Sequence, residues 1–137
     1  MNEFKNILIV RTDRIGDVVL TLPLADIIKK HYPKSRVSFL IREYTSPLLF
    51  NNPKIDEVLI LKENNNKTLI HKNIQLLKRK NFDCVFIVNA SFKLASILFM
   101  SNIKNRIGTG YRWYSFLFNH KIFVHRKTGE KHELEYN

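Results

Sequence analysis

The sequence predicts an α/β fold in which helices cover both faces of one parallel sheet. Two observations support this prediction. Short runs of branched apolar residues alternate with segments of helical length, and the connections between them are short. Strands that alternate with helices in this way are typical of parallel sheets with right-handed crossovers. With 45% hydrophobic residues among 137, the chain can bury the core of one compact domain.

The first half of the chain reads as strand, helix, strand, turn and strand. Residues 6–12 (NILIVRT) are almost continuously apolar, as in a strand buried on both faces. The segment 17–31 loses that pattern and ends in KKHYP, whose cations and proline favour a helix end. Further strands are predicted at 36–41 (RVSFLI) and 57–61 (EVLIL), with a short helical turn over 45–53 between them.

The second half continues the alternation. An amphipathic helix is predicted over 66–81, where Leu69, Ile70, Ile74 and Leu77 share one face and Lys and Arg lie elsewhere. The remaining predicted elements are a strand at 84–89, a more deeply buried helix at 91–102, and short strands at 106–110 and 121–126 that flank an aromatic segment at 111–118.

The chain is strongly basic, since 23 Lys and Arg against 12 Asp and Glu give a net charge of +11. This excess favours anionic partners such as phosphorylated sugars, nucleic acid or an acidic membrane surface, and it equally fits cations spread over a solvated surface. Strings typical of helix-turn-helix, zinc-knuckle and RNA-recognition modules are absent. A non-enzymatic basic module that binds nucleic acid or an anionic membrane therefore stays the second hypothesis.

The sequence also indicates a compartment. Its apolar runs are shorter than a membrane span, and the opening MNEFKNILIV lacks a secretory pattern. We expect a cytoplasmic protein or one peripheral to a membrane. The single cysteine, Cys84, lies in the apolar run CVFIVN, where a small buried hydrophobe is a better interpretation than a nucleophile.

The loop after the first strand, RTDRIGD at 11–17, is the candidate site, because ligands of such sheets bind at the carboxyl ends of the strands. Gly16 allows a tight turn and close approach of a ligand, and the next helix offers free N–H groups to an anion. Asp17 has two interpretations: a helix cap or first-turn acid, or a general base kept ionised by Arg11 and Arg14.

Several kinds of chemistry find no support in the sequence. Neither the dinucleotide-binding G-x-G-x-x-G pattern nor a phosphate loop is present. The five histidines are scattered without metal-ligand spacing, and no Ser-His or Cys-His arrangement suggests a covalent intermediate. We therefore expect no metal and no cofactor.

Four segments together resemble the heptosyltransferase-like glycosyltransferases of family 9. The first, 7–33, contains the loop RTDRIGD followed by VVLTLP, and the second, 36–61, contains NPKIDEV. The third, 82–110, contains FDCVFIV and the string RIG, and the fourth, KHELEYN at 131–137, is similar to the H-x-x-E-x-N element. In one place the sequence departs from the pattern, because Asn89 stands where the family has an acidic residue.

The resemblance implies a Rossmann-like domain spanning 1–137, the N-terminal, acceptor-binding half of a two-domain B-type glycosyltransferase whose C-terminal nucleotide-sugar domain is absent. It implies inverting transfer, typically from ADP-heptose to an anionic glycolipid acceptor in lipopolysaccharide core synthesis. The implied setting is the cytoplasmic side of the inner membrane, with possible membrane contact and no nucleic acid partner. This chain alone would be an incomplete and inactive half.

The resemblance also implies roles for individual residues. Asp17 would be the catalytic base that takes the proton of the acceptor hydroxyl. The acceptor-binding residues would be Arg11, Thr12, Asp13, Arg14, Gly16 and Arg112, and the supporting residues His132, Glu135 and Asn137. Arg42 is a further candidate for binding an anion, with a solvated surface cation as the equal alternative.

Overall fold

The computed structural model describes residues 4–12, 15–87, 91–109 and 120–122, without the side chains of 109 and 120–122. Over these residues the main sheet has six strands in the order β3-β2-β1-β6-β7-β8, and every neighbouring pair is parallel. The strands are β1 (Asn6–Val10), β2 (Arg36–Ile41), β3 (Glu57–Ile60), β6 (Cys84–Ile87), β7 (Asn105–Thr109) and β8 (His120–Ile122). The predicted parallel α/β fold is confirmed.

Strand β1 lies at the centre of the sheet, between β2 and β6. Its side chains alternate between the two faces: Ile7 and Ile9 join one buried cluster, and Leu8 and Val10 join the other. This two-sided burial explains the nearly continuous apolar run of residues 6–12.

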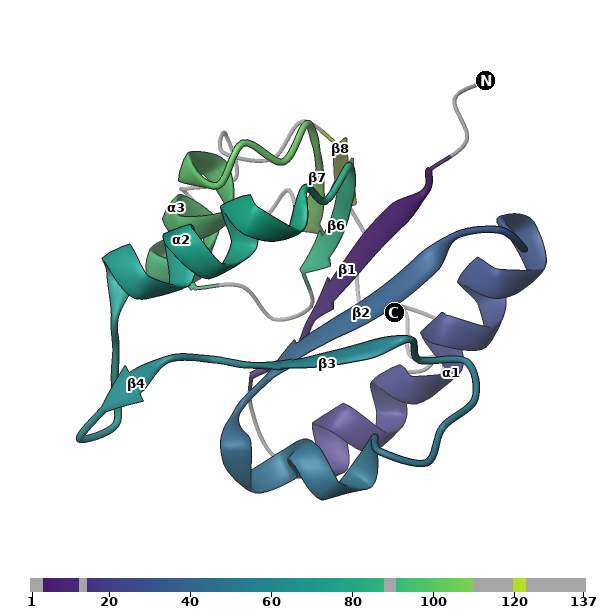
Figure 1. Ribbon diagram of the computed structural model, residues 1–137, viewed down its shortest axis with the longest axis horizontal. Helices are drawn as coiled ribbons and strands as arrows, with labels where there is room; N and C mark the ends of the chain where they lie inside the picture. Colours follow the sequence, from purple (N-terminus) through teal and green to yellow (C-terminus); the bar gives the residue numbers. More distant parts are fainter. Residues whose placement is uncertain (1–3, 13–14, 88–90, 110–119, 123–137) are drawn as a thin grey trace.

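One face of the sheet is covered by α1 (Ile15–His31) and the short 3₁₀ helix η1 (Glu43–Leu48) (Figure 1). Helix α1 buries Val18, Leu24, Ala25 and Ile28 against this face. It ends with Lys29, Lys30 and His31 in its last turn, where cations are favoured by the helix dipole.

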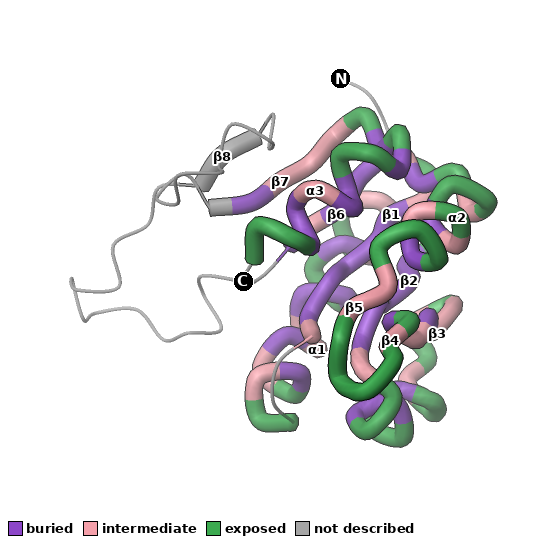
Figure 2. Tube along the Cα trace, turned by 90° about the vertical axis from the view of Figure 1, so that its left-hand side faces the viewer, coloured by how far each residue is buried: buried purple, intermediate pink, exposed green. Residues whose placement is uncertain are grey.

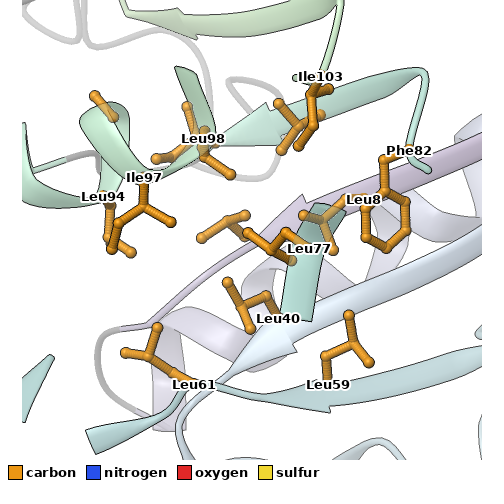
Figure 3. Packing of buried hydrophobic residues seen from close by; sticks show 14 residues of the cluster. Leu8, Leu40, Leu59, Leu61, Leu77, Phe82, Leu94, Ile97, Leu98 and Ile103 are labelled. Atoms are coloured by element: carbon orange, nitrogen blue, oxygen red, sulfur yellow. The ribbon is translucent and has the colours of Figure 1, made fainter. Parts of the chain in front are cut away.

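The other face is covered by α2 (Ile70–Lys80) and α3 (Phe92–Met100). Figure 3 shows Leu77 of α2 and Leu94, Ile97 and Leu98 of α3 packed over the strands, in the same cluster as Leu8. Ser91 caps α3, because its Oγ accepts a hydrogen bond from the Leu94 amide at 3.2 Å. Helices therefore cover both faces, as predicted.

A short hairpin that was not predicted from the sequence follows β3. Strands β4 (Glu63–Asn64) and β5 (Lys67–Thr68) pair antiparallel, and the two turn residues, Asn65 and Asn66, have φ of 52° and 63°. Positive φ at both central residues is what a type I′ turn requires, and Asn adopts it more readily than most residues. The hairpin is largely exposed (Figure 2).

The predicted helix at 66–81 is therefore wrong at its start, since α2 begins at Ile70. Asn73 of α2, which is fully buried, anchors the hairpin to the helix. Its side chain accepts a hydrogen bond from the Lys62 amide at 2.8 Å and donates to the Lys62 and Leu69 carbonyls at 3.0 and 2.7 Å. The hairpin thus has a fixed base.

Other predicted elements are present. The strand at 36–41 is confirmed at both ends, whereas the short helical turn predicted over 45–53 lies earlier, as η1 at Glu43–Leu48. The strand predicted at 106–110 is β7, which contains the string RIG. The aromatic segment 111–118 lies outside the described residues. Within the ranges described, none of the helices has the length and apolar character needed to cross a membrane.

Candidate functional site

The carboxyl ends of β1, β2, β3 and β6 lie along one edge of the sheet, because these strands are parallel. The chain leaves β1 through α1 on one face and leaves the neighbouring β6 through α3 on the other. In open α/β sheets this point of divergence is where ligands bind. The residues that directly follow β1 therefore form the candidate site.

Arg11 and Asp17 form an ion pair at this point, with Arg11 Nη2 3.2 Å from Asp17 Oδ1. The Arg11 side chain is 2% exposed, whereas that of Asp17 is 32% exposed. A buried guanidinium therefore holds the inner side of a carboxylate that stays open to solvent on its outer side. Such a carboxylate keeps its orientation and can still reach a ligand.

Backbone alternation explains how Arg11 reaches Asp17. The Arg11 amide donates to the Leu40 carbonyl at 3.1 Å, so the residue continues the hydrogen bonding of β1 with β2. Because Ile7 and Ile9 face α1, the side chain of Arg11 falls on the same face. Thr12 then falls on the opposite face, toward α3. The side chains of Arg11 and Thr12 thus lie on opposite faces of the sheet at this edge.

Helix α1 begins two residues earlier than predicted, at Ile15. Asp17 is therefore a first-turn acid rather than the N-cap, a position where the helix dipole favours a carboxylate. Gly16 lies inside the same turn with φ outside the left-handed region, so the predicted tight turn at Gly16 is wrong. Among the described residues, and apart from the adjoining backbone and chain neighbours, no atom lies within 4 Å of the place of a Cβ on Gly16.

A pocket of about 560 Å³ lies at the same edge of the sheet, on the side of α3, and we call it the hairpin pocket. Its described lining comes from the ends of β1, β2 and β3, the β4–β5 hairpin and the start of α3: Thr12, Arg42, Leu61, Glu63, Asn66, Thr68, Ser91 and Leu94. Its volume is within the ~300–1,000 Å³ range of small-molecule sites. The lining is mostly polar, with Leu61 and Leu94 as its buried apolar part.

Arg42 is engaged within the hairpin pocket rather than free for an anion. Its Nε donates to Glu63 Oε1 at 3.0 Å and its Nη2 to Asn66 Oδ1 at 3.4 Å, and its guanidinium lies over the Tyr44 ring at 5.4 Å. The hydrogen bond to Glu63 raises the pKa of Arg42 above its ordinary value against the opposing effect of burial. The pair is therefore a partly exposed, charge-neutral unit.

Two acidic residues of the family-like segments are structural. Asp83 accepts from the Lys5 and Asn6 amides at 2.8 and 3.2 Å, at the amino edge of the sheet. Asp56 accepts from Lys29 Nζ and from the Val37 amide, both at 2.7 Å. Burial alone would raise the pKa of Asp56, but these two hydrogen bonds and the nearby cations lower it overall.

Cys84 is buried and carries no disulfide. Burial, with a smaller contribution from the Asp83 charge, raises the pKa of its thiol to about 12. This agrees with its interpretation as a small hydrophobe. Over the part of the chain that the structure describes, no three His, Cys, Asp or Glu side chains gather as a metal site would require.

The structure thus brings Arg11, Thr12, Gly16 and Asp17 together at the sheet edge. The other predicted site residues lie outside the described residues, as does Asn89: Asp13, Arg14, Arg112, His132, Glu135 and Asn137. Sequence reasoning missed the hairpin residues Glu63, Asn66 and Thr68 and the cap Ser91. The polar string ENNNKT directly after a strand was the signal for the first three.

Comparison with known proteins gives this geometry a context. No protein-family model matches the chain. The chain is 31% identical over 133 residues to a Haemophilus influenzae protein assigned as a glycosyltransferase, an alignment covering 97% of this chain and 38% of that protein. It is 26% identical over 116 residues to lipopolysaccharide heptosyltransferase 3 of Escherichia coli, covering 80% of this chain and 34% of the relative. The chain spans less than half the length of both.

Solved structures share the fold. The glycosyl transferase family 9 structure from Veillonella parvula matches with a TM-score of 0.82 at 19% identity, over 97% of this chain and 39% of that one. Escherichia coli heptosyltransferase WaaC with ADP-2-deoxy-2-fluoro heptose matches with a TM-score of 0.73 at 18% identity, over 95% and 45%. The sheet with helices on both faces is consistent with the N-terminal half of a B-type glycosyltransferase. The homologues and structural neighbours of this chain are therefore heptosyltransferase-like glycosyltransferases of family 9, which it matches over part of their length.

Proposed function

We propose that this chain is the acceptor-binding part of an inverting, heptosyltransferase-like glycosyltransferase in which Asp17 is the general base. The observation that carries the proposal is the Arg11–Asp17 pair, a carboxylate held at 3.2 Å by a buried guanidinium and 32% exposed on its outer side. A general base must be ionised, fixed in orientation and able to reach the proton that it removes. The contact with Arg11 and the exposed outer side of Asp17 support this role.

In the proposed reaction, Asp17 takes the proton of an acceptor hydroxyl while that oxygen attacks the anomeric carbon of the donor sugar. The bond from that carbon to the leaving nucleoside diphosphate breaks in the same step, so the carbon is inverted and no covalent enzyme intermediate forms. Arg11 holds the carboxylate, and the N-terminus of α1 adds a favourable dipole. The absence of a Cβ on Gly16 would ease the approach of the acceptor oxygen.

The relatives suggest the substrates. One of the solved neighbours is an ADP-heptose lipopolysaccharide heptosyltransferase of Escherichia coli, and two related proteins from Escherichia coli and Haemophilus ducreyi are named for heptose transfer to lipopolysaccharide or lipooligosaccharide. We propose ADP-heptose as the donor and a lipopolysaccharide core sugar as the acceptor. The donor would be held largely by a second domain, and the protein would work at the cytoplasmic face of the inner membrane.

A chimera tests the role of Asp17. Residues 1–137 replace the segment that they match in a related heptosyltransferase, and transfer from ADP-heptose is followed by mass spectrometry of the acceptor. Asp17→Asn should lower kcat by about 10²–10⁴-fold, the usual contribution of a general base. Asp26→Asn is the matched control, because Asp26 is an exposed acid on the same helix. A chimera that keeps its kcat after Asp17→Asn rules out the proposed base.

A further inference from the structure

The described lining of the hairpin pocket is polar but charge-balanced, in a chain whose net charge is +11. Among the described residues that line it, Arg42 and Glu63 are the charged ones, and they are hydrogen-bonded to each other at 3.0 Å. A phosphate or carboxylate entering this pocket would have to compete with Glu63 for Arg42 and would lie beside the negative charge of Glu63. This part of the lining is therefore poorly suited to an anion.

The other polar groups suit a neutral, hydroxyl-rich ligand. Thr12, Thr68 and Ser91 bring hydroxyl groups, which both donate and accept, and Asn66 brings an amide. Ser91 Oγ accepts from the Leu94 amide, so its proton is directed to another acceptor. Sugar hydroxyls can satisfy such mixed donors and acceptors, and the apolar faces of a sugar ring can contact Leu61 and Leu94.

The hairpin aims these groups at the pocket. Glu63 and Thr68 are directly opposite each other in the antiparallel pair, so their side chains lie on the same face of the hairpin. Asn73 holds the hairpin base through its three hydrogen bonds to Lys62 and Leu69. The lining is thus fixed by the fold before any ligand arrives.

We propose that the hairpin pocket is a subsite for an uncharged sugar ring, and that it selects against a phosphorylated one. This inference rests on the proposed function in one respect only: the ring would be part of the acceptor whose hydroxyl approaches Asp17. Thr12 and Arg11 follow each other in the chain, so the pocket and the Arg11–Asp17 pair lie on either side of one strand end. Anionic parts of the acceptor would then lie elsewhere.

The test is an NMR titration of the 15N-labelled chain with a free heptose, with the same heptose carrying a phosphate, and with inorganic phosphate. The neutral heptose should shift the amides of residues 61–68 and 91–94, with several-fold weaker effects from the phosphorylated sugar and none from phosphate. Equal or larger shifts of these amides with either anion would overturn the proposal. No shift with the neutral heptose would overturn it as well.

Substitutions in the hairpin test whether Glu63 and Thr68 determine the preference for a neutral sugar. Glu63→Gln leaves Arg42 without its counter-charge, so it should strengthen binding of the phosphorylated heptose several-fold and weaken that of the neutral one. Thr68→Val should weaken the neutral sugar without improving the phosphorylated one. Glu57→Gln is the matched control, because Glu57 pairs with Lys80 at the amino edge and should leave both affinities unchanged. Unaltered phosphate-sugar binding in Glu63→Gln would contradict the proposal.

The two proposals can fail separately. A chimera that loses kcat on Asp17→Asn, together with a pocket that ignores the neutral heptose, would leave the general base standing and remove the subsite. If the pocket binds the neutral heptose but Asp17→Asn leaves kcat of the chimera unchanged, the subsite stands and the general base is removed.

Discussion

Arg11 and Asp17 meet across the loop that joins β1 to α1, with 3.2 Å between Nη2 and Oδ1. The Arg11 guanidinium is buried and the Asp17 carboxylate is partly exposed, so one side of the pair faces the protein interior and the other faces solvent. On the inside, the guanidinium fixes the carboxylate. On the outside, the carboxylate faces the edge of the sheet where parallel α/β folds bind ligands.

The shape of the Arg11 side chain should therefore matter beyond its charge. Arg11→Lys keeps the charge but loses the planar fork that holds a carboxylate. We expect kcat of the chimera to fall about 10–100-fold, since a misoriented base loses part of its contribution. The thermal midpoint should fall by only a few degrees, consistent with about 1–2 kcal/mol. Wild-type kcat in Arg11→Lys would show that the fork does not position Asp17.

The buried amide of Asn73 should be important for stability. Asn73→Ala removes three hydrogen bonds and leaves the Lys62 backbone without these partners. We expect a loss of about 2–3 kcal/mol in the free energy of unfolding, measured by urea titration. Gln75→Ala, at an exposed position of the same helix, should change it by less than about 0.5 kcal/mol. Similar losses in both variants would refute the anchoring role.

Asp56 should make stability depend on pH in the acid range. Its pKa is lowered in the folded protein from the ordinary 3.8, so its contribution is fully present above the unfolded value. It is lost as pH falls below about 4, through the folded pKa. Urea unfolding should show Asp56→Asn less stable than wild type by about 0.5–1 kcal/mol at pH 7, because the carboxylate is partly exposed. This difference should shrink by pH 3; a constant difference would mean that the charge contributes nothing.

The thiol of Cys84 should be unreactive while the protein is folded. Because its pKa is raised to about 12 by burial, about one molecule in ten thousand carries the thiolate at pH 8. A chromogenic disulfide reagent should modify one thiol per chain in urea and almost none without it. Rapid modification of the native protein would indicate local opening of β6.

Much of the fold could be predicted because its signals are local. The apolar run of residues 6–12 is long and uniform because β1 is buried on both faces, and KKHYP marks the end of α1 by charge and proline. The hairpin was missed because its polar residues continue directly into the amphipathic pattern of α2. Three consecutive asparagines, two of them with positive φ, were the available sign.

The site could be predicted only in part, for a physical reason. Arg11, Gly16 and Asp17 come from one short stretch of chain, so a sequence motif reveals them together. The hairpin pocket is assembled from the ends of three strands, a hairpin and a helix start, spread from Thr12 to Leu94. No local pattern signals such a convergence, and the pairing of Arg42 with Glu63 appears only when β2 and the hairpin are placed side by side.

The exposed β4–β5 hairpin also bears on how this fold could diversify. None of its residues belongs to either buried cluster, and Asn73 secures its base independently of its tip. Insertions, deletions or substitutions between Glu63 and Thr68 could then reshape one wall of the pocket while the sheet and the Arg11–Asp17 pair stay intact. Ligand preference could thus evolve, or be engineered, separately from the reacting group.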